Sequence, residues 1–443
     1  MVEICTVGGF SEVGKNMTVI RYKGEAVILD MGVQVDKYIA AKDDAEDEIV
    51  NFSDLLRKGA VPDERLIKEW RKEVLAIVPT HAHLDHLGAI PYMANKYDAD
   101  IICSRYSAAV LRALLEEKNS NLKKRIIELP NNATYKVSEN ITIEFIEITH
   151  STPDTVMIAV HTPDETIVYC NDFKLDDTPT LGNKPNYKRI KALGKEGIKL
   201  LIMDSLYSRA KRKTPSESVA RERLKEVLFE TDLRGKGLIV TTFSSHIARL
   251  KAIAEFGEKL GRRVLFMGRS LAKYSYAAQD CGIYQVSDHA EIVGYKAKVK
   301  KRLKEIEREN RDKYMLVVTG HQGELDSVLS SIVDEKINYK LFPGDIIIFS
   351  CCVIPNPVNI ANRKVLEEKL LQKRITIYKD IHESGHASGL DHRELISMLK
   401  PEYIIPAHGD SSKTEPLLEI AEELGYVSGK TVLIMHDGAI IKL

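Results

Sequence analysis

The feature that most constrains this chain is a cluster of metal-binding residue types, His-Ala-His-Leu-Asp-His, at residues 81–86. The cluster follows a short apolar run, Val74–Pro79, which is predicted to be a buried strand. A divalent metal such as zinc takes imidazole nitrogens and carboxylate oxygens as ligands, and a catalytic site keeps one position open for water. One strand or helix cannot aim four such groups at a single point, whereas a loop leaving a buried strand can. The motif therefore predicts a layered α/β fold with a metal site at the end of a strand.

Further polar residues come directly after other predicted strands. The strands expected in the first half are Asn16–Tyr22, Ala26–Met31, Ile141–Ile148, Thr155–His161, Thr166–Cys170 and Leu200–Met203. His150, Asp172 and Asp204 each follow one of them, and His408 follows a later strand at Tyr403–Pro406. Each residue alone would commonly be a turn or capping residue. Ligands gather at the carboxyl ends of strands in layered α/β folds, so beside the upstream motif we expect metal ligands there.

The chain changes character after Asp204. Thr214-Pro215-Ser216-Glu217 resembles a capping box and predicts a helix that runs to about Glu230. Apolar runs then alternate with helical stretches, at Leu238–Phe243, Val264–Met267, Met315–Thr319 and Ile346–Ser350, which is typical of a parallel sheet. Strand-like segments return at Ile375–Tyr378, Tyr403–Pro406, Val432–His436 and Ala439–Lys442. We therefore predict a domain at 209–373 inserted between the two parts of another, at 1–208 and 374–443.

Length and composition agree with this division. The chain has 443 residues, and single cores stop growing at about 250–300 residues. Basic and acidic residues balance at 64 each, which argues against a general polyanion binder but not against a local basic groove. The six cysteines form no CxxC pair, so we expect reduced, mostly buried thiols. The start does not resemble a signal peptide and no apolar stretch could span a membrane, so a cytoplasmic protein is expected.

The motif at 81–86, His150, Asp172 and the late Pro-Ala-His-Gly at 406–409 together resemble the metallo-β-lactamase superfamily. The resemblance implies an αββα sandwich whose site binds two zinc ions, with manganese or magnesium as possible substitutes. One metal is then held by His81, His83, His150 and Asp172. The other is held by Asp85, His86, Asp172 and His408. Two such ions can hold a bridging hydroxide as nucleophile and stabilise charge on a phosphoryl oxygen.

The long insertion between Asp204 and His386 is similar to the β-CASP branch, whose members cut RNA or DNA. By that resemblance Asp85, Asp204 and His386 are catalytic: His386 meets the scissile phosphate or the leaving oxygen, and Asp204 orients a neighbouring histidine. Within the branch, Gly8–Met17, Thr319–Glu324 and the loop at 382–388 resemble ribonuclease J. The chain ends soon after its last strand, and this compact form resembles the archaeal group.

Ribonuclease J removes nucleotides from the 5′ end of single-stranded RNA, prefers a 5′-monophosphate and also cuts internally. A terminal phosphate can be held by backbone N–H groups of glycine-rich loops, with help from hydroxyls and a histidine. The residues expected to hold the RNA and its 5′-phosphate all follow predicted strand ends: Ser244, Ser245, Gly320, His321, Gln322, Gly323, Ser350, His382 and Ser384. Where the family has Gly-Ser-Gln-Gly, this chain has Gly-His-Gln-Gly at 320–323.

Several alternatives stay open at this stage. The same metal chemistry would serve an endonuclease on RNA or DNA, and a small-molecule hydrolase or an inactive nucleic-acid-binding protein would use the same fold. The basic runs Arg209–Lys213 and Lys296–Lys304 are either RNA contacts or solvated faces. A homodimer and contacts with other RNA-decay proteins are possible partners by the resemblance, and no membrane contact is expected.

Overall fold

The computed structural model describes residues 1–43, 50–118 and 120–443. Their packing separates two compact units. Unit 1 comprises Met1–Asp177, Asn183–Thr214 and Ser384–Leu443, and unit 2 comprises Thr178–Gly182 and Pro215–Glu383.

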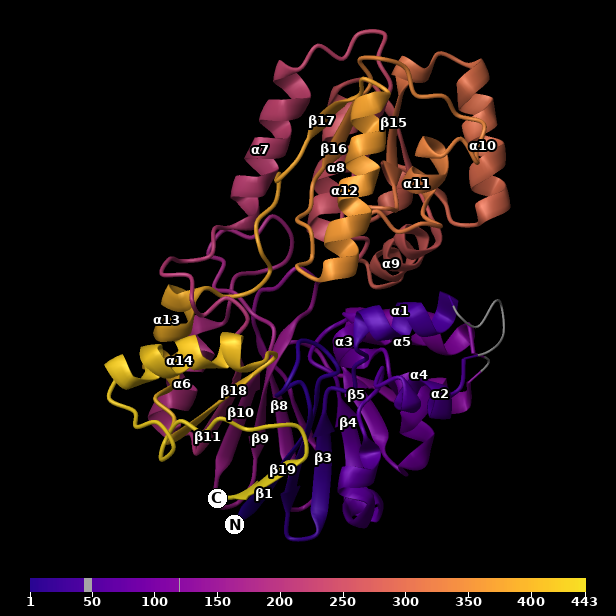
Figure 1. Cartoon of the computed structure of the whole chain (residues 1–443). Helices are drawn as coiled ribbons and strands as arrows, with labels where there is room; N and C mark the ends of the chain where they lie inside the picture. The colour runs from indigo at the N-terminus through magenta and orange to yellow at the C-terminus, as the bar shows by residue number, and fades with distance from the viewer. Residues whose placement is uncertain (44–49, 119) are drawn as a thin grey trace. The chain divides into compact units, whose positions relative to one another are not determined.

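In the described part of unit 1 the strands form two sheets (Figure 1). The first sheet has the order β19-β1-β2-β3-β4-β5-β6, with bounds Ala439–Lys442, Val2–Gly8, Met17–Tyr22, Glu25–Leu29, Val74–Val78, Asp100–Cys103 and Ile126–Glu128. The second sheet has the order β18-β11-β10-β9-β8-β7, with bounds Tyr403–Ala407, Leu200–Asp204, Thr166–Cys170, Val156–His161, Thr142–Glu147 and Thr134–Lys136.

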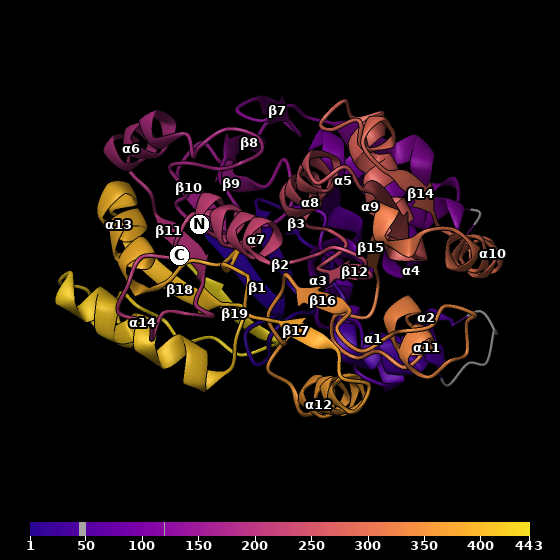
Figure 2. The ribbon, with the colours of Figure 1, turned by 90° about the horizontal axis from the view of Figure 1, so that it is seen from above.

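Helices cover the outer faces of these two sheets. They are α1 (Val35–Asp43), α2 (Phe52–Arg57), α3 (Leu84–Leu87), α4 (Ile90–Met93), α5 (Arg105–Glu116), α6 (Tyr187–Glu196), α13 (Gly389–Leu399) and α14 (Ser411–Glu423). Short 3-10 helices lie at Glu64–Glu73, Ala94–Lys96 and Asn121–Arg125. Figures 1 and 2 show α6, α13 and α14 together beside the second sheet, whereas α1–α5 lie on the side of the first sheet.

The main core of unit 1 lies between the two sheets. Val27 of β3, Phe145 of β8 and Tyr169 of β10 are among the fully buried side chains that meet there. A second core packs the other face of the second sheet against α13 and α14, through side chains such as Leu395 and Leu417. Burying one such side chain stabilises the fold by about 1.5–3 kcal/mol. The layers therefore run helices, sheet, sheet, helices, which confirms the predicted αββα sandwich.

Strand direction brings the predicted ligands to one edge. β10 pairs parallel with β11, and β11 pairs parallel with β18. β8 has the same direction, because it pairs antiparallel with β9, which in turn pairs antiparallel with β10. The carboxyl ends of β8, β10, β11 and β18 thus share an edge. Pro406 is tolerated within β18 because that strand lies at the border of its sheet, where β11 is the one named strand of the described chain that pairs with it.

Unit 2 contains a parallel sheet, as predicted. Its strand order is β14-β13-β15-β12-β16-β17, with bounds Glu291–Val293, Arg263–Met267, Tyr314–Val318, Leu238–Thr241, Ile346–Phe349 and Thr376–Tyr378. The helices are α7 (Glu217–Glu230), α8 (Ile247–Lys259), α9 (Arg269–Asp280), α10 (Lys296–Arg308), α11 (Val328–Val333) and α12 (Pro357–Gln372), with 3-10 turns at Val286–Asp288 and Arg311–Lys313. Every strand pair in the described sheet is parallel.

Two local predictions were wrong. Val432–His436 is not a strand, because only Val432 forms an isolated bridge, to Ile404. The helix α7 is capped by Ser216, whose side chain accepts a hydrogen bond from the Ser218 N–H, and not by Thr214. The Thr214 hydroxyl donates instead to the carbonyl oxygen of residue 386, and this tertiary bond is invisible in the local pattern.

The remaining general expectations concern the thiols and the membrane. Cys5, Cys103, Cys170 and Cys351 are buried, which confirms that most of the cysteines lie inside the protein. Among the described residues, no helix combines the length and the apolar character that crossing a membrane requires.

Candidate metal centre

The loop that carries residues 81–86 is held close to the ends of β2 and β3. The backbone N–H of Asn16 donates to the carbonyl oxygen of Asp85 at 3.1 Å, and that of Met31 donates to the carbonyl oxygen of His86 at 2.7 Å. A Cβ atom at Gly32 would lie 1.6 Å from the same Asp85 oxygen. Glycine is therefore required at this close approach, which sets the direction in which the histidines leave the loop.

The structure brings the predicted ligands into two groups that share Asp172. The first group is His81, His83, His150 and Asp172, and the second is Asp85, His86, Asp172 and His408. Within each group, one potential ligand atom from every residue lies within 4.8 Å of the others. Asp172, just beyond β10, is the common member because its carboxylate has two oxygens and lies between the two sets of imidazoles.

The spacing in the first group suits a tetrahedral metal. His83 Nδ1 lies 3.0 Å from His81 Nε2 and 3.1 Å from His150 Nε2. Asp172 Oδ2 lies 3.5 Å from Nε2 of both His81 and His150. Zinc–nitrogen bonds of about 2.0–2.1 Å in a tetrahedron separate the ligand atoms by about 3.3 Å. The donor set therefore fits a divalent cation.

Two further observations support a cation at this place. Asp172 is buried, and its Oδ1 has no hydrogen-bond partner in the described chain. A buried carboxylate oxygen without a partner is costly unless a positive charge compensates it. Burial also lowers the pKa of His81 and His150 well below the usual value and that of His83 to about 4. Neutral imidazoles are the form that binds metal.

A buried aspartate that the sequence patterns did not single out orients His86. Asp30, at the end of β3, accepts hydrogen bonds from the Thr80 N–H at 2.7 Å and the Tyr169 hydroxyl at 3.0 Å. Its Oδ2 also lies 2.7 Å from His86 Nδ1. A carboxylate only accepts, so His86 Nδ1 carries the proton and Nε2 is left for a metal. The backbone of Asp30 is left-handed, with φ +58°, and the sequence around it would have predicted only a turn residue.

Asn16 was likewise missed as an individual residue, although it lies in the Gly8–Met17 stretch. Its Oδ1 lies 3.1 Å from His408 Nδ1, and its Nδ2 donates to the carbonyl oxygen of Asp85 at 3.0 Å. The amide thereby links the loop that carries Asp85 to the loop that carries His408. Because Asn16 is buried, this link is protected from water.

His386 stands at the side of the two groups and is held by Asp204. Its Nδ1 donates to Asp204 Oδ2 at 2.9 Å, and its Nε2 lies 3.8 Å from Asp172 Oδ2. Burial opposes the charged form of His386, but Asp172 and Asp204 outweigh it and raise its pKa to about 9. The arrangement gives a proton-carrying imidazole whose Nε2 faces Asp172, the residue that the two groups of predicted ligands share.

The loop before His386 closely approaches His150, one of the predicted metal ligands. His150 Nδ1 donates to the carbonyl oxygen of Gly385 at 2.7 Å. A Cβ atom at Gly385 would lie 2.9 Å from that same nitrogen, so only glycine fits. Ser384, one of the residues predicted to bind RNA, accepts a hydrogen bond from the His386 N–H at 3.0 Å.

The other eight residues predicted to bind the 5′-phosphate lie in unit 2, after β12, β15, β16 and β17. They are Ser244, Ser245, Gly320, His321, Gln322, Gly323, Ser350 and His382. Because β15, β12 and β16 are parallel neighbours, the loops that follow them meet at one edge of the sheet. The His321 and His382 rings lie 4.5 Å and 5.7 Å from the Phe243 ring.

Some of these side chains are occupied by internal hydrogen bonds. The Gln322 amide donates to the Cys352 carbonyl oxygen at 3.0 Å and accepts from the Ile354 N–H at 2.9 Å. The Ser350 hydroxyl accepts from the Arg249 guanidinium at 2.8 Å. That guanidinium is fully buried and makes paired bonds of 2.6 Å and 2.8 Å with the Glu217 carboxylate, so this part of the edge is rigid.

Family models match most of the chain. Residues 11–212 match the metallo-beta-lactamase superfamily, residues 235–367 match the beta-CASP domain of ribonuclease J, and residues 374–434 match a Zn-dependent metallo-hydrolase RNA specificity domain. The predicted fold class, a metallo-β-lactamase sandwich with a β-CASP domain, is thereby confirmed.

Curated relatives match over the full length. Ribonuclease J of Pyrococcus abyssi is 42% identical, with 100% of this chain and 97% of the relative covered. Ribonuclease J of Methanocaldococcus jannaschii is 41% identical, with 99% and 98% covered. Ribonuclease J of Thermus thermophilus is 31% identical, with 100% and 74% covered. A crystal structure of an Enterococcus faecalis V583 protein of unknown function has the same fold, with TM-score 0.66, 18% identity and both chains fully covered.

Proposed function

Because the chain belongs to the ribonuclease J family, we propose that it is a 5′→3′ exoribonuclease that acts on single-stranded RNA and prefers a 5′-monophosphate. The family and its metallo-β-lactamase domain make the chain a metal-dependent nuclease that acts on RNA. The observation that carries the proposal is the pair of ligand groups joined by Asp172. We propose that each group binds one zinc ion and that manganese or magnesium could substitute.

The two groups would hold metal ions that, when bound, would supply an activated hydroxide and positive charge for the phosphoryl oxygens. Asp172 spans both groups, and Asp85 belongs to the second. His386 directs Nε2 at the scissile phosphate and can give its proton to the leaving oxygen. Asp204 accepts the Nδ1–H of His386 and keeps the ring in that orientation.

The preference for the 5′ end rests on the residues of unit 2 that were predicted to bind phosphate. The glycine-rich loop at 320–323 offers backbone N–H groups to a terminal phosphate, as nests of N–H groups do in other anion sites. Ser244 and Ser245 would add hydroxyl donors, and His382 an imidazole. Loops that hold a terminal phosphate in this way would favour RNA that carries a 5′-monophosphate.

The test compares RNA oligonucleotides with a 5′-triphosphate, a 5′-monophosphate or a 5′-hydroxyl, each labelled at its 5′ end. The proposal predicts mononucleotide as the first labelled product and the fastest turnover on the monophosphate. A ladder of longer labelled fragments would instead support an endonuclease with the same metal site. Metal analysis of the purified protein should give about two ions per chain, and reconstitution with zinc, manganese or magnesium identifies the active metal.

Other expectations stay predictions. They are the domain boundaries at 208/209 and 373/374, the cytoplasmic location, the homodimer and contacts with other RNA-decay proteins.

A further inference from the structure

A surface segment of unit 1, residues 207–213, is fastened alongside the loop that carries His386. Tyr207 forms a parallel bridge with Ser388. The Gly389 N–H donates to the Ala210 carbonyl oxygen at 2.8 Å. This close packing explains the glycine, because a Cβ there would lie 2.9 Å from that same oxygen. The segment is therefore held in one conformation beside the catalytic loop.

Tyr207 presents an aromatic ring next to the proposed acid. Its ring centroid lies 6.0 Å from that of His386, with the two planes inclined at 64°. Tyr207 is 36% exposed, and His386, which donates to Asp204, keeps 18% of its side chain exposed, so both rings are accessible to a ligand. A base that lies on the Tyr207 ring would place the adjoining phosphate within the reach of His386.

Positive charge follows directly after this ring. Arg209, Lys211 and Arg212 are exposed, and none of them forms an ion pair with a residue that the structure describes. Lys213, by contrast, pairs with Glu394 at 3.0 Å. Proteins that bind single-stranded nucleic acid combine aromatic rings, which stack on the bases, with a row of cationic side chains, which bind the phosphates.

We propose that the segment 207–213 is a contact site for single-stranded RNA: Tyr207 stacks on a base next to the scissile phosphate, and Arg209, Lys211 and Arg212 bind the phosphates that follow. The inference rests on the proposed RNA cleavage at this centre, but not on its direction. It makes Tyr207 a substrate-positioning residue, because a stacked base holds the phosphate against His386.

The first test replaces the ring. Tyr207→Leu should lower kcat/KM roughly 5- to 150-fold, as expected for the loss of one stacked base. Tyr207→Phe and Tyr207→Trp should keep most of the activity, because each retains an aromatic face. Circular dichroism and thermal unfolding of the three variants would show whether the fold is intact. Equal losses in the Leu, Phe and Trp variants would overturn the stacking role.

The second test removes single bases from the RNA. Abasic nucleotides placed one at a time around the cut bond should lower kcat/KM for the unchanged protein at one position. In Tyr207→Leu the same abasic substitution should cause no further loss, because both changes remove the same stacking interaction. If the losses multiply at every position, Tyr207 does not touch a base.

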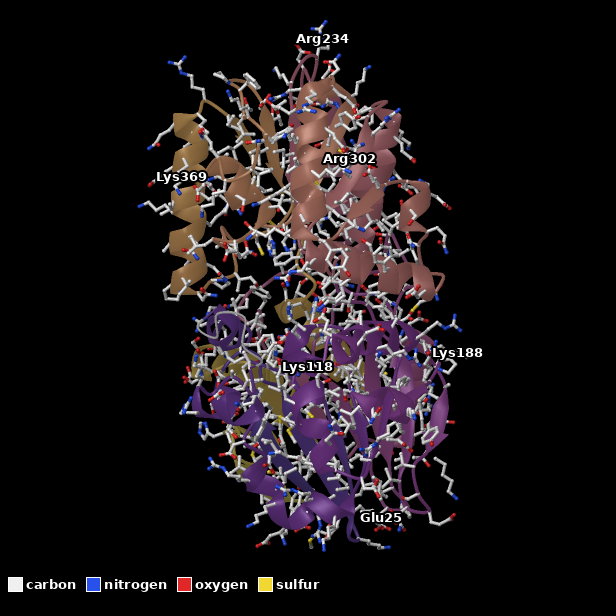
Figure 3. The ribbon with its side chains drawn as sticks, turned by 90° about the vertical axis from the view of Figure 1, so that its right-hand side faces the viewer. Glu25, Lys118, Lys188, Arg234, Arg302 and Lys369 are labelled. Atoms are coloured by element: carbon white, nitrogen blue, oxygen red, sulfur yellow. The ribbon has the colours of Figure 1, made fainter. Side chains whose placement is uncertain are left out.

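The third test concerns the cations. The triple substitution of Arg209, Lys211 and Arg212 by glutamine should flatten the plot of log kcat/KM against log salt by about 0.7 for each phosphate that the variant no longer binds. The matched control replaces Lys188, Lys191 and Lys195 of α6 by glutamine, which removes the same number of positive charges from residues that are also exposed. Figure 3 shows Lys188 pointing outward from unit 1. An equal change of slope in the control would show that Arg209, Lys211 and Arg212 do not bind specific RNA phosphates.

These outcomes separate the inference from the proposed function. If the products are internal fragments, the exonuclease direction fails, yet the abasic position can still be counted from the bond that is cut. If the protein cleaves no RNA, the proposed function fails, and fluorescence anisotropy with labelled single-stranded RNA decides the role of Tyr207. Unchanged RNA affinity in Tyr207→Leu would then overturn the inference.

Discussion

The substitution Asp30→Asn tests whether a buried carboxylate, and not only the ligands, determines metal binding. Asp30 Oδ1 accepts from the Thr80 N–H, and Oδ2 faces His86 Nδ1 and the Tyr169 hydroxyl. Asparagine has nearly the same size, but one of its two polar atoms is a donor. Whichever way the amide turns, its NH₂ faces a group that donates a hydrogen bond to Asp30 in the unchanged protein.

The magnitude follows from the two orientations. If the amide NH₂ faces Thr80, one buried N–H loses its acceptor, which costs about 1–3 kcal/mol of stability. If it faces His86, the ring takes the other tautomer and carries its proton on Nε2, which a metal must displace. Loss of a partner that orients a metal-binding histidine lowers metal affinity by about 10- to 100-fold. We therefore expect weaker metal binding together with a less stable metal-free protein.

The assay is a competition titration of zinc against a chromophoric chelator, with denaturant unfolding of the metal-free protein alongside. The control is Asp98→Asn, which removes an exposed carboxylate of unit 1 and should alter neither quantity. If Asp30→Asn binds two metals with the affinity of the unchanged protein, then Asp30 does not orient His86, and the reasoning is refuted.

Other substitutions test the proposed catalytic residues and one ion-pair cluster in each unit. Asp172→Ala should abolish turnover and reduce metal content, whereas His386→Ala should keep both metals and still lose activity; activity in the latter would remove His386 from the mechanism. Arg249→Met should destabilise unit 2 by about 2–4 kcal/mol in denaturant unfolding, because the buried Glu217 carboxylate loses the guanidinium and keeps His246 as a charged partner. A cost below about 1 kcal/mol would show that the pair is dispensable. Glu144 has its pKa lowered to about 2 by a histidine and an arginine, against burial. In metal-free protein the interaction of Glu144 with His161 and Arg189 should therefore contribute about 1–2 kcal/mol to the free energy of unfolding above pH 4.5, and this contribution should be lost as the pH falls toward 2. Glu144→Gln should accordingly lower the free energy of unfolding less at pH 3 than at pH 7, as denaturant unfolding at the two pH values would show.

The sequence alone was sufficient for the fold class, and it named the residues proposed to bind metal, which the structure brings into two groups. Apolar runs of strand length and the polar residues after them are local features, and strand direction places their ends together. The pattern at 81–86 joins a strand to four metal-binding groups, so His150, Asp172 and His408 could be proposed as partners before any distance was known. Similarity to a known family then connected these residues with the inserted domain and with RNA.

The tertiary structure decided which buried groups hold those residues in place. Asp30 and Asn16 orient ligands that are far from them in the chain, and neither lies in a pattern that signals metal binding. Thr214 was expected to cap a helix but bonds to the loop at 386, since its hydroxyl finds that partner only after folding. The position of Tyr207 beside His386 likewise depends on folding, because a parallel bridge between Tyr207 and Ser388 brings the two rings together. Local patterns determine strands and candidate ligands, but contacts between residues distant in sequence depend on packing, which no local pattern contains.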